Sequence, residues 1–114
     1  MSTQSVYDHH KEAFANFDMD EMLADYSEDS VIVTNVGTYK GLDEISEMFE
    51  ALFEEFSQPG VEFNVTEEIV EDDIAYFTWN ADTNDHEYTF ASDTFIIIDD
   101  IIRYQTVAAD AIEK

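Results

Sequence analysis

The sequence contains no cysteine, and this absence excludes both a disulfide framework and a metal site built on thiolates. A small secreted scaffold stapled by disulfides therefore has no support. No run of about 18 apolar residues occurs, and the segment Met1–Ser5 has neither the basic nor the apolar region of a signal peptide. We therefore expect a cytoplasmic protein without membrane contact.

Positive charge is also scarce, since four basic residues stand against 28 acidic ones and leave a formal net charge of −24. Such a surface repels nucleic acid phosphates and anionic membranes, so neither is an expected partner. Self-repulsion of this kind destabilises a compact domain unless salt screens it. The imbalance therefore indicates adaptation to a salt-rich, halophilic cytoplasm, an ordinary acidic protein, or a protein with a basic partner.

Several motifs of enzyme chemistry are missing as well. There is no glycine-rich phosphate loop, no HExxH zinc motif and no GxSxG nucleophile elbow, so phosphate transfer, zinc hydrolysis and serine acyl transfer have no support. The three histidines, His9, His10 and His86, are too scattered to indicate a metal site. We therefore expect no metal and no organic cofactor.

The 114 residues, 45% of them hydrophobic, predict one domain spanning residues 1–114 around one core. Apolar residues recur at helical spacing over Ser5–Phe17, over the short segment 18–26 and most clearly over Leu42–Phe56, where the acidic residues occupy the other face. Segments rich in β-formers predict strands at 31–36, 61–70, 74–83, 87–98 and 101–107. This order predicts an α+β fold with about three helices over the concave face of a curved antiparallel sheet.

The hairpin around Asn84-Asp85 determines which side chains share a face of that sheet. If these two residues form the turn, Trp79 pairs with Phe90 and Tyr76 with Asp93. One face then carries Phe77, Trp79, Tyr88, Phe90, Ile96 and Ile98, and the other carries Tyr76, Thr78, Asn80, Thr89, Asp93, Phe95 and Ile97, with a local shift at any bulge. We expect the first face to form a homodimer interface and the second to line a pocket beneath the helices.

Two stretches of the chain carry a family resemblance: FANFDMDEMLADYSEDSVIVTNVGTYKGLDEI at 14–45 and FASDTFIIIDDIIRYQTV at 90–107. Together with the order of elements, they resemble the nuclear-transport-factor-2-like superfamily, and specifically its SnoaL-like polyketide cyclase and ketosteroid isomerase branch. The resemblance implies a cone-shaped, cystatin-like fold with a cavity for a small hydrophobic or oxygen-bearing molecule. Because this fold serves isomerases, dehydratases, cyclases, hydrolases and non-enzymatic binders, it does not choose the reaction.

The resemblance also implies three functional positions. The tyrosine that donates a hydrogen bond to the oxyanion in ketosteroid isomerases corresponds to His10, which can still donate. Their first-strand aspartate base corresponds to Thr34, or to Asn35 if the strand shifts by one, and neither residue can remove a carbon-bound proton at neutral pH. Their late-strand carboxylic acid corresponds to Asp93, so this group is retained.

His10 and Asp93 are therefore the candidate catalytic residues, an acid–base pair whose pKa values burial and mutual charge would tune toward neutrality. Further candidate pocket residues are Tyr26, Thr34, Tyr76, Asn80 and Gln105. The structural alternatives are a His10 satisfied by a partner in the core and an Asp93 bonded to Tyr76 or to a helix end.

Three functions remain open from the sequence. The first is a cofactor-free cyclase, dehydratase or isomerase, and the second is a non-catalytic ligand-binding or dimerisation module of the same fold. The third is a protein-interaction domain that uses an apolar face of the sheet.

Overall fold

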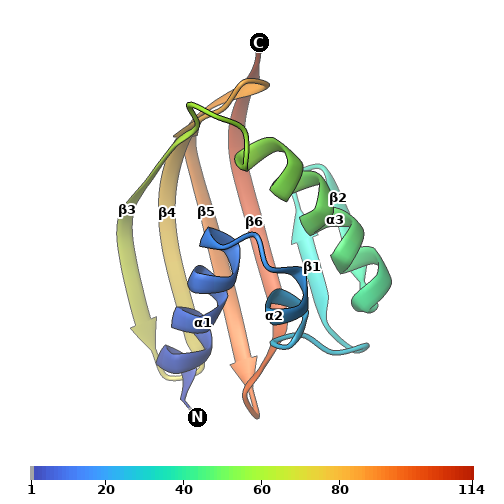
Figure 1. Cartoon of the computed structure of the whole chain (residues 1–114). Coiled ribbons are helices and arrows are strands. Elements are labelled where there is room, and N and C mark those ends of the chain that lie inside the picture. The colour runs from blue at the N-terminus through green and yellow to red at the C-terminus, as the bar shows by residue number, and fades with distance from the viewer. Residues whose placement is uncertain (1) are drawn as a thin grey trace.

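The computed structural model describes residues 2–114 as three helices packed against one curved six-stranded sheet (Figure 1). The helices are α1 (Thr3–Ala15), α2 (Met19–Leu23) and α3 (Gly41–Phe56). The strands are β1 (Val31–Thr34), β2 (Gly37–Lys40), β3 (Glu62–Glu71), β4 (Ile74–Asp82), β5 (His86–Ile98) and β6 (Ile101–Glu113). The α+β fold predicted from the sequence is confirmed.

Side-chain caps explain where the first two helices begin. Ser2 and Ser5 form a capping box, in which each side chain accepts a hydrogen bond from the backbone N–H of the other residue. As a result α1 begins at Thr3, before the predicted start. Asp18 caps α2, because its carboxylate accepts a hydrogen bond from the N–H of Glu21.

The sheet order is β2-β1-β6-β5-β4-β3, and its neighbouring strands are antiparallel except for β1 and β6, which run parallel. The sheet is therefore mixed rather than antiparallel throughout. A second correction concerns the strand predicted over Val31–Val36, because β1 ends at Thr34 and forms a hairpin with β2, which was not predicted. The hydroxyl of Thr34 shapes its turn by accepting from the N–H groups of Val36 and Gly37 and by donating to the carbonyl of Gly37.

The hairpin turn between β4 and β5 forms at Asn84-Asp85 as predicted. The N–H of Thr83 donates to the carbonyl of His86 at 2.9 Å across the turn. Further along the hairpin, Ala81 pairs with Tyr88, which is the predicted register.

A bulge between Trp79 and Ala81 then shifts the register of β4 against β5 by one residue. Beyond the bulge, Trp79 pairs with Ala91 and Phe77 with Asp93. The predicted pairs Trp79–Phe90 and Tyr76–Asp93 are therefore wrong. Side chains alternate between the two faces of a sheet. The one-residue shift therefore changes which β5 side chains share a face with the β4 residues from Ile74 to Trp79.

The two faces of the hairpin are consequently mixtures of the predicted sets. The helix-covered face of the sheet carries buried residues from both sets: Phe77, Trp79, Tyr88, Asp93, Phe95 and Ile97. Phe90, Ile96 and Ile98 lie on the opposite, open face and are 56%, 36% and 44% exposed. The helix-covered face therefore holds the core. Within residues 2–114, no helix has the length and apolar character needed to cross a membrane.

Candidate functional site

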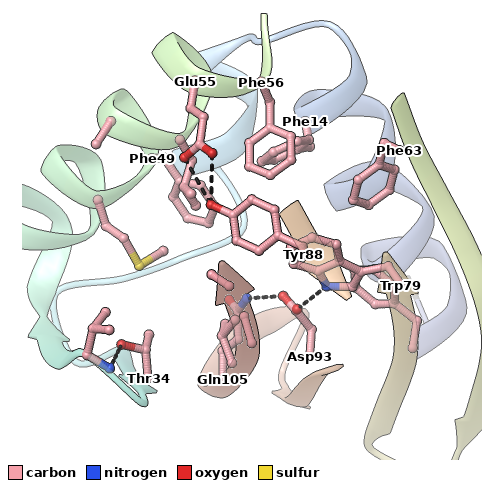
Figure 2. Close-up of a pocket in the computed structure, with 18 of the residues that line it drawn as sticks. Phe14, Thr34, Phe49, Glu55, Phe56, Phe63, Trp79, Tyr88, Asp93 and Gln105 are labelled. Atoms are coloured by element: carbon pink, nitrogen blue, oxygen red, sulfur yellow. Dashed lines mark hydrogen bonds between the residues drawn. The ribbon is translucent and has the colours of Figure 1, made fainter. Parts of the chain in front are cut away.

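A cavity of about 610 Å³ lies between the helices and the helix-covered face of the sheet (Figure 2). Most of its wall is aromatic or aliphatic, with side chains from α1, α3 and several strands, among them Phe14, Phe49, Phe56, Phe63 and Trp79. The packing that borders the cavity is dense, since the rings of Phe56 and Tyr88 stack at 5.6 Å and those of Phe63 and Trp79 meet at 5.2 Å. This size and lining are typical of a site for a small, largely apolar molecule.

A chain of hydrogen bonds holds the carboxyl group of Asp93 in this apolar wall. The indole N–H of Trp79 donates to Oδ1 of Asp93 at 2.9 Å, and the amide Nε2 of Gln105 donates to Oδ2 at 3.0 Å. The hydroxyl of Tyr26 donates to Oε1 of Gln105, which fixes the direction of the amide. Both carboxyl oxygens are therefore positioned by donors from neighbouring strands (Figure 2).

Burial raises the pKa of Asp93 to about 6, and the hydrogen bonds from Trp79 and Gln105 act in the opposite direction. Desolvation penalises the ionised form, whereas two donors stabilise it, and the balance lies close to neutrality. A carboxyl group with such a pKa can accept or return a proton under physiological conditions.

His10, on α1, also lines the cavity, but its chemistry differs from the prediction. Burial, with a smaller contribution from His9, lowers its pKa to about 3, so the ring is neutral at physiological pH. The ring packs edge-on against Phe95 at 4.8 Å. Within residues 2–114, Nδ1 of His10 is buried without a hydrogen-bond partner, and no hydrogen bond joins His10 to Asp93. The predicted tuning of both groups toward neutrality is therefore wrong for His10.

The remaining candidate residues divide between the cavity and other places. Gln105 and Thr34 line the cavity, although the hydroxyl of Thr34 is occupied in the β1–β2 turn. Tyr26 is not one of the lining residues, and its hydroxyl contacts the site through Gln105.

Tyr76 and Asn80 are not among the residues that line the cavity. The bulge places Tyr76 opposite Ile69 and Thr94, while the side chain of Asn80 accepts a hydrogen bond from Asn64. Their expected place in the pocket is corrected accordingly. Across residues 2–114, no cluster of three or more histidine or carboxylate side chains is arranged to hold a metal ion.

A second polar cluster in the cavity wall was not predicted from the sequence. Its centre is Glu55 on α3, which accepts hydrogen bonds from Thr83 at 2.7 Å, from the hydroxyl of Tyr88 at 2.9 Å, and is 2.9 Å from Nδ1 of His86. Figure 2 shows the Tyr88 hydroxyl directed at both carboxylate oxygens. The helical pattern alone assigns Glu55 to a solvated face, since only the tertiary fold brings the β4–β5 turn beside it.

The match to a family model agrees with this architecture, because the model of the SnoaL-like domain matches residues 7–104. The chain belongs to the SnoaL-like domain family. No curated protein matches its sequence significantly.

Solved structures share the fold of this SnoaL-like domain at low sequence identity. A candidate ketosteroid isomerase from Kribbella flavida has a TM-score of 0.76 at 13% identity, over 98% of this chain and 80% of the other. A candidate polyketide cyclase from Sinorhizobium meliloti has a TM-score of 0.75 at 15% identity, over 94% and 99%. A de novo designed protein with a curved β-sheet reaches 0.77 at 12% identity, over 96% and 88%. These likenesses establish the fold, and the reaction has to be argued from the cavity.

Proposed function

We propose that this SnoaL-like domain binds a small, largely apolar molecule bearing an oxygen function and transfers protons on it without a cofactor, in a cyclisation, dehydration or isomerisation. The observation that carries the proposal is Asp93, the carboxyl group held by two donors in an apolar cavity with a pKa of about 6. An apolar wall keeps water from competing for the carboxylate, and fixed donors keep it in one orientation.

In this proposal, ionised Asp93 accepts a proton from an acidic C–H or O–H group of the ligand and returns it at a second atom. Trp79 and Gln105 hold the carboxylate while its charge changes. The neutral ring of His10 forms part of the same wall, and its N–H group can donate a hydrogen bond to an oxygen of the ligand.

A non-catalytic binding module is the second candidate function, and the geometry of Thr34 favours it. The position that carries a base in the isomerases holds a hydroxyl here, and this hydroxyl is already engaged in the β1–β2 turn. In a pure binding module, Asp93 would only anchor a hydroxyl of the ligand.

Ligand binding can be followed through the fluorescence of Trp79, which is the only tryptophan of the chain and lines the cavity. We expect 4-hydroxystilbene, an apolar phenol, to quench this fluorescence. The Ala109→Phe variant, which places a ring in the cavity wall, should weaken binding by roughly 5- to 150-fold, since an overfilled site costs on the order of 1 to 3 kcal/mol. Glu50→Phe on the exposed side of α3 is the control and should bind normally. Equal binding by the two variants would place the ligand outside the cavity.

We also propose that the open face of the sheet joins two copies of the chain. Ile69, Ile74, Ile96 and Tyr104 are between 36% and 49% exposed on this face, and they lie on adjacent strands because Ile96 pairs with both Ile74 and Tyr104. A second copy presents the same patch, so a two-fold axis covers both at once. Phe77, Trp79 and Tyr88, which were expected in the interface, belong to the cavity wall instead.

Light scattering tests the dimer directly. We expect a mass of about 26 kDa for the wild type, twice the 13.1 kDa of one chain. The Ile96→Lys variant should run as a monomer, because an unpaired ammonium group at the centre of an apolar interface is costly to desolvate. A monomeric wild type at high protein concentration would refute this arrangement.

The net charge of −24 supports the further proposal of a salt-rich cytoplasm as the working environment. Raising KCl from about 0.1 M to about 1 M shortens the range of charge repulsion from about 10 Å to about 3 Å. The melting temperature measured by circular dichroism should therefore rise by several degrees over this interval. A melting temperature that is flat or falling would contradict the halophilic interpretation.

A further inference from the structure

The cluster around Glu55 leaves one polar atom unused at the cavity. Burial tends to raise the pKa of Glu55, but hydrogen bonds from Thr83, His86 and Tyr88 outweigh it and hold the pKa below its usual value. Glu55 is therefore an ionised carboxylate, which can only accept hydrogen bonds. It follows that Nδ1 of His86 donates to Glu55, so that in the tautomer with a single ring proton Nε2 carries no hydrogen and is an acceptor.

The Nε2 atom of His86 is available to a ligand. Within residues 2–114 it has no hydrogen-bond partner, and His86 is one of the residues that line the cavity, with a side chain 32% exposed. The backbone at His86 is also held in place, since its backbone N–H donates to the hydroxyl of Thr83 at 3.0 Å. The turn therefore holds the imidazole in one place with its acceptor unoccupied.

This acceptor lies far from Asp93 along the cavity. His86 begins β5, and Asp93 follows seven residues later on the same strand. A strand rises about 3.3 Å per residue, and the bulge and the curvature shorten it slightly, so His86 and Asp93 lie roughly 20 Å apart along β5. Tyr88 and Trp79, whose rings meet at 5.3 Å, occupy the apolar stretch between the two polar ends. One elongated ligand is therefore needed to contact both ends.

We propose that His86, oriented by Glu55, is a second anchoring site that accepts a hydrogen bond from a ligand hydroxyl, so that the natural ligand is an elongated apolar molecule with an oxygen group at each end. This inference rests on the proposed function, because it takes the same cavity as the binding site and Asp93 as the anchor of the first oxygen group. Glu55 is a positioning residue in this scheme, since it acts through the ring of His86.

A matched pair of probes tests the second anchor. 4-Hydroxystilbene and 4,4′-dihydroxystilbene share one rigid apolar body and differ by one hydroxyl, and Trp79 fluorescence reports the binding of both. We expect the dihydroxy compound to bind the wild type about tenfold more tightly, which is the effect of one hydrogen bond in a desolvated site. In His86→Phe and Glu55→Gln the ratio of the two dissociation constants should fall to about one, whatever the change in affinity for 4-hydroxystilbene itself. Glu54→Gln, the exposed neighbour on α3, is the control and should keep the tenfold ratio.

The outcomes separate this inference from the proposed function. Equal affinities of the wild type for the two stilbenes overturn the second anchor and leave the cavity as a binding site, whereas no binding of either overturns both. Long-range ¹H–¹⁵N NMR of the His86 ring gives an independent readout if Glu55→Gln fails to fold. Nε2 should be unprotonated in the neutral ring and should shift when 4,4′-dihydroxystilbene binds, but not with 4-hydroxystilbene. An Nε2 resonance that stays fixed with both compounds shows a purely structural cluster and overturns the proposal.

Discussion

Replacement of Asp93 by asparagine should lower kcat/KM for proton abstraction by about 10²- to 10⁴-fold, because a positioned general base contributes roughly that much to rate. A suitable probe is 5-nitrobenzisoxazole, an apolar bicycle that fits the character of the cavity wall. A carboxylate removes its C3 proton while the N–O bond breaks, and the electron pair leaves on oxygen as a coloured nitrophenolate. The absorbance of this product measures the rate without knowledge of the natural substrate.

The pH dependence of the same reaction identifies the base. Only the ionised carboxylate removes a proton, so wild-type kcat/KM should rise with pH and level off above an apparent pKa near 6, the value to which burial raises Asp93. The Asp93→Asn variant should show a flat, low profile. Asp72→Asn, in the exposed β3–β4 turn with a positive φ that asparagine tolerates, removes one charge elsewhere and should match the wild type.

Two results would count against a catalytic Asp93. A wild type no faster than free acetate at equal concentration would leave the binding-module function, and an Asp93→Asn variant with full activity would place the base on another group. Circular dichroism of each variant establishes that the loss of rate is not a loss of fold.

Local sequence patterns were sufficient for most of the fold. The apolar period of Leu42–Phe56 predicted α3, and β-rich segments between short turns predicted β3 to β6 to within a few residues, except that β6 runs on to Glu113. Those signals act over a few residues, and the physics that forms each element is equally local. Asp93 became a candidate through the resemblance, because it stands at the position of the late-strand carboxylic acid of the ketosteroid isomerases.

Two of the errors arise from features that local patterns do not encode: a one-residue bulge and a pairing between strands remote in the chain. The residues around Trp79 do not indicate a bulge, yet the bulge turns Tyr76 away from the cavity. The parallel pairing of β1 with β6 joins segments about seventy residues apart, for example Val31 with Tyr104. Hydrophobic periodicity contains no information about either.

The cluster at Glu55 was missed for the same reason. A glutamate among many on α3 looks solvated in the sequence, and its partners Thr83, His86 and Tyr88 lie 28 to 33 residues later, around a turn. The threonine, histidine and tyrosine around the β4–β5 turn indicate a polar cluster only when it is known that the end of α3 packs beside that turn. Clusters assembled by tertiary packing therefore need the structure.

The free energy of unfolding should record the burial of Asp93 as a dependence on pH. In the unfolded chain this carboxyl has its ordinary pKa of 3.8, and in the folded protein the pKa is about 6. Between these values the folded state retains a proton that the unfolded state has released, so rising pH favours unfolding. The contribution is absent below about pH 3.8, grows through this window and reaches a constant level above about pH 6. A difference of about two pKa units corresponds to a loss on the order of 3 kcal/mol.

Asp93→Asn removes this titration and should therefore gain stability relative to the wild type as pH rises. The asparagine directs its NH₂ group at one of the two donors, Trp79 or Gln105, and this clash lowers stability by an amount that does not depend on pH. We expect the difference in unfolding free energy between variant and wild type, measured with urea in about 1 M KCl, to change in favour of the variant by on the order of 3 kcal/mol from about pH 4 to about pH 7.5. The other acidic residues are common to both proteins, so their titration cancels in the difference. Two stability curves that stay parallel over this range would mean that Asp93 titrates alike in the folded and unfolded chains, and a carboxyl with that property is solvated rather than held in an apolar wall.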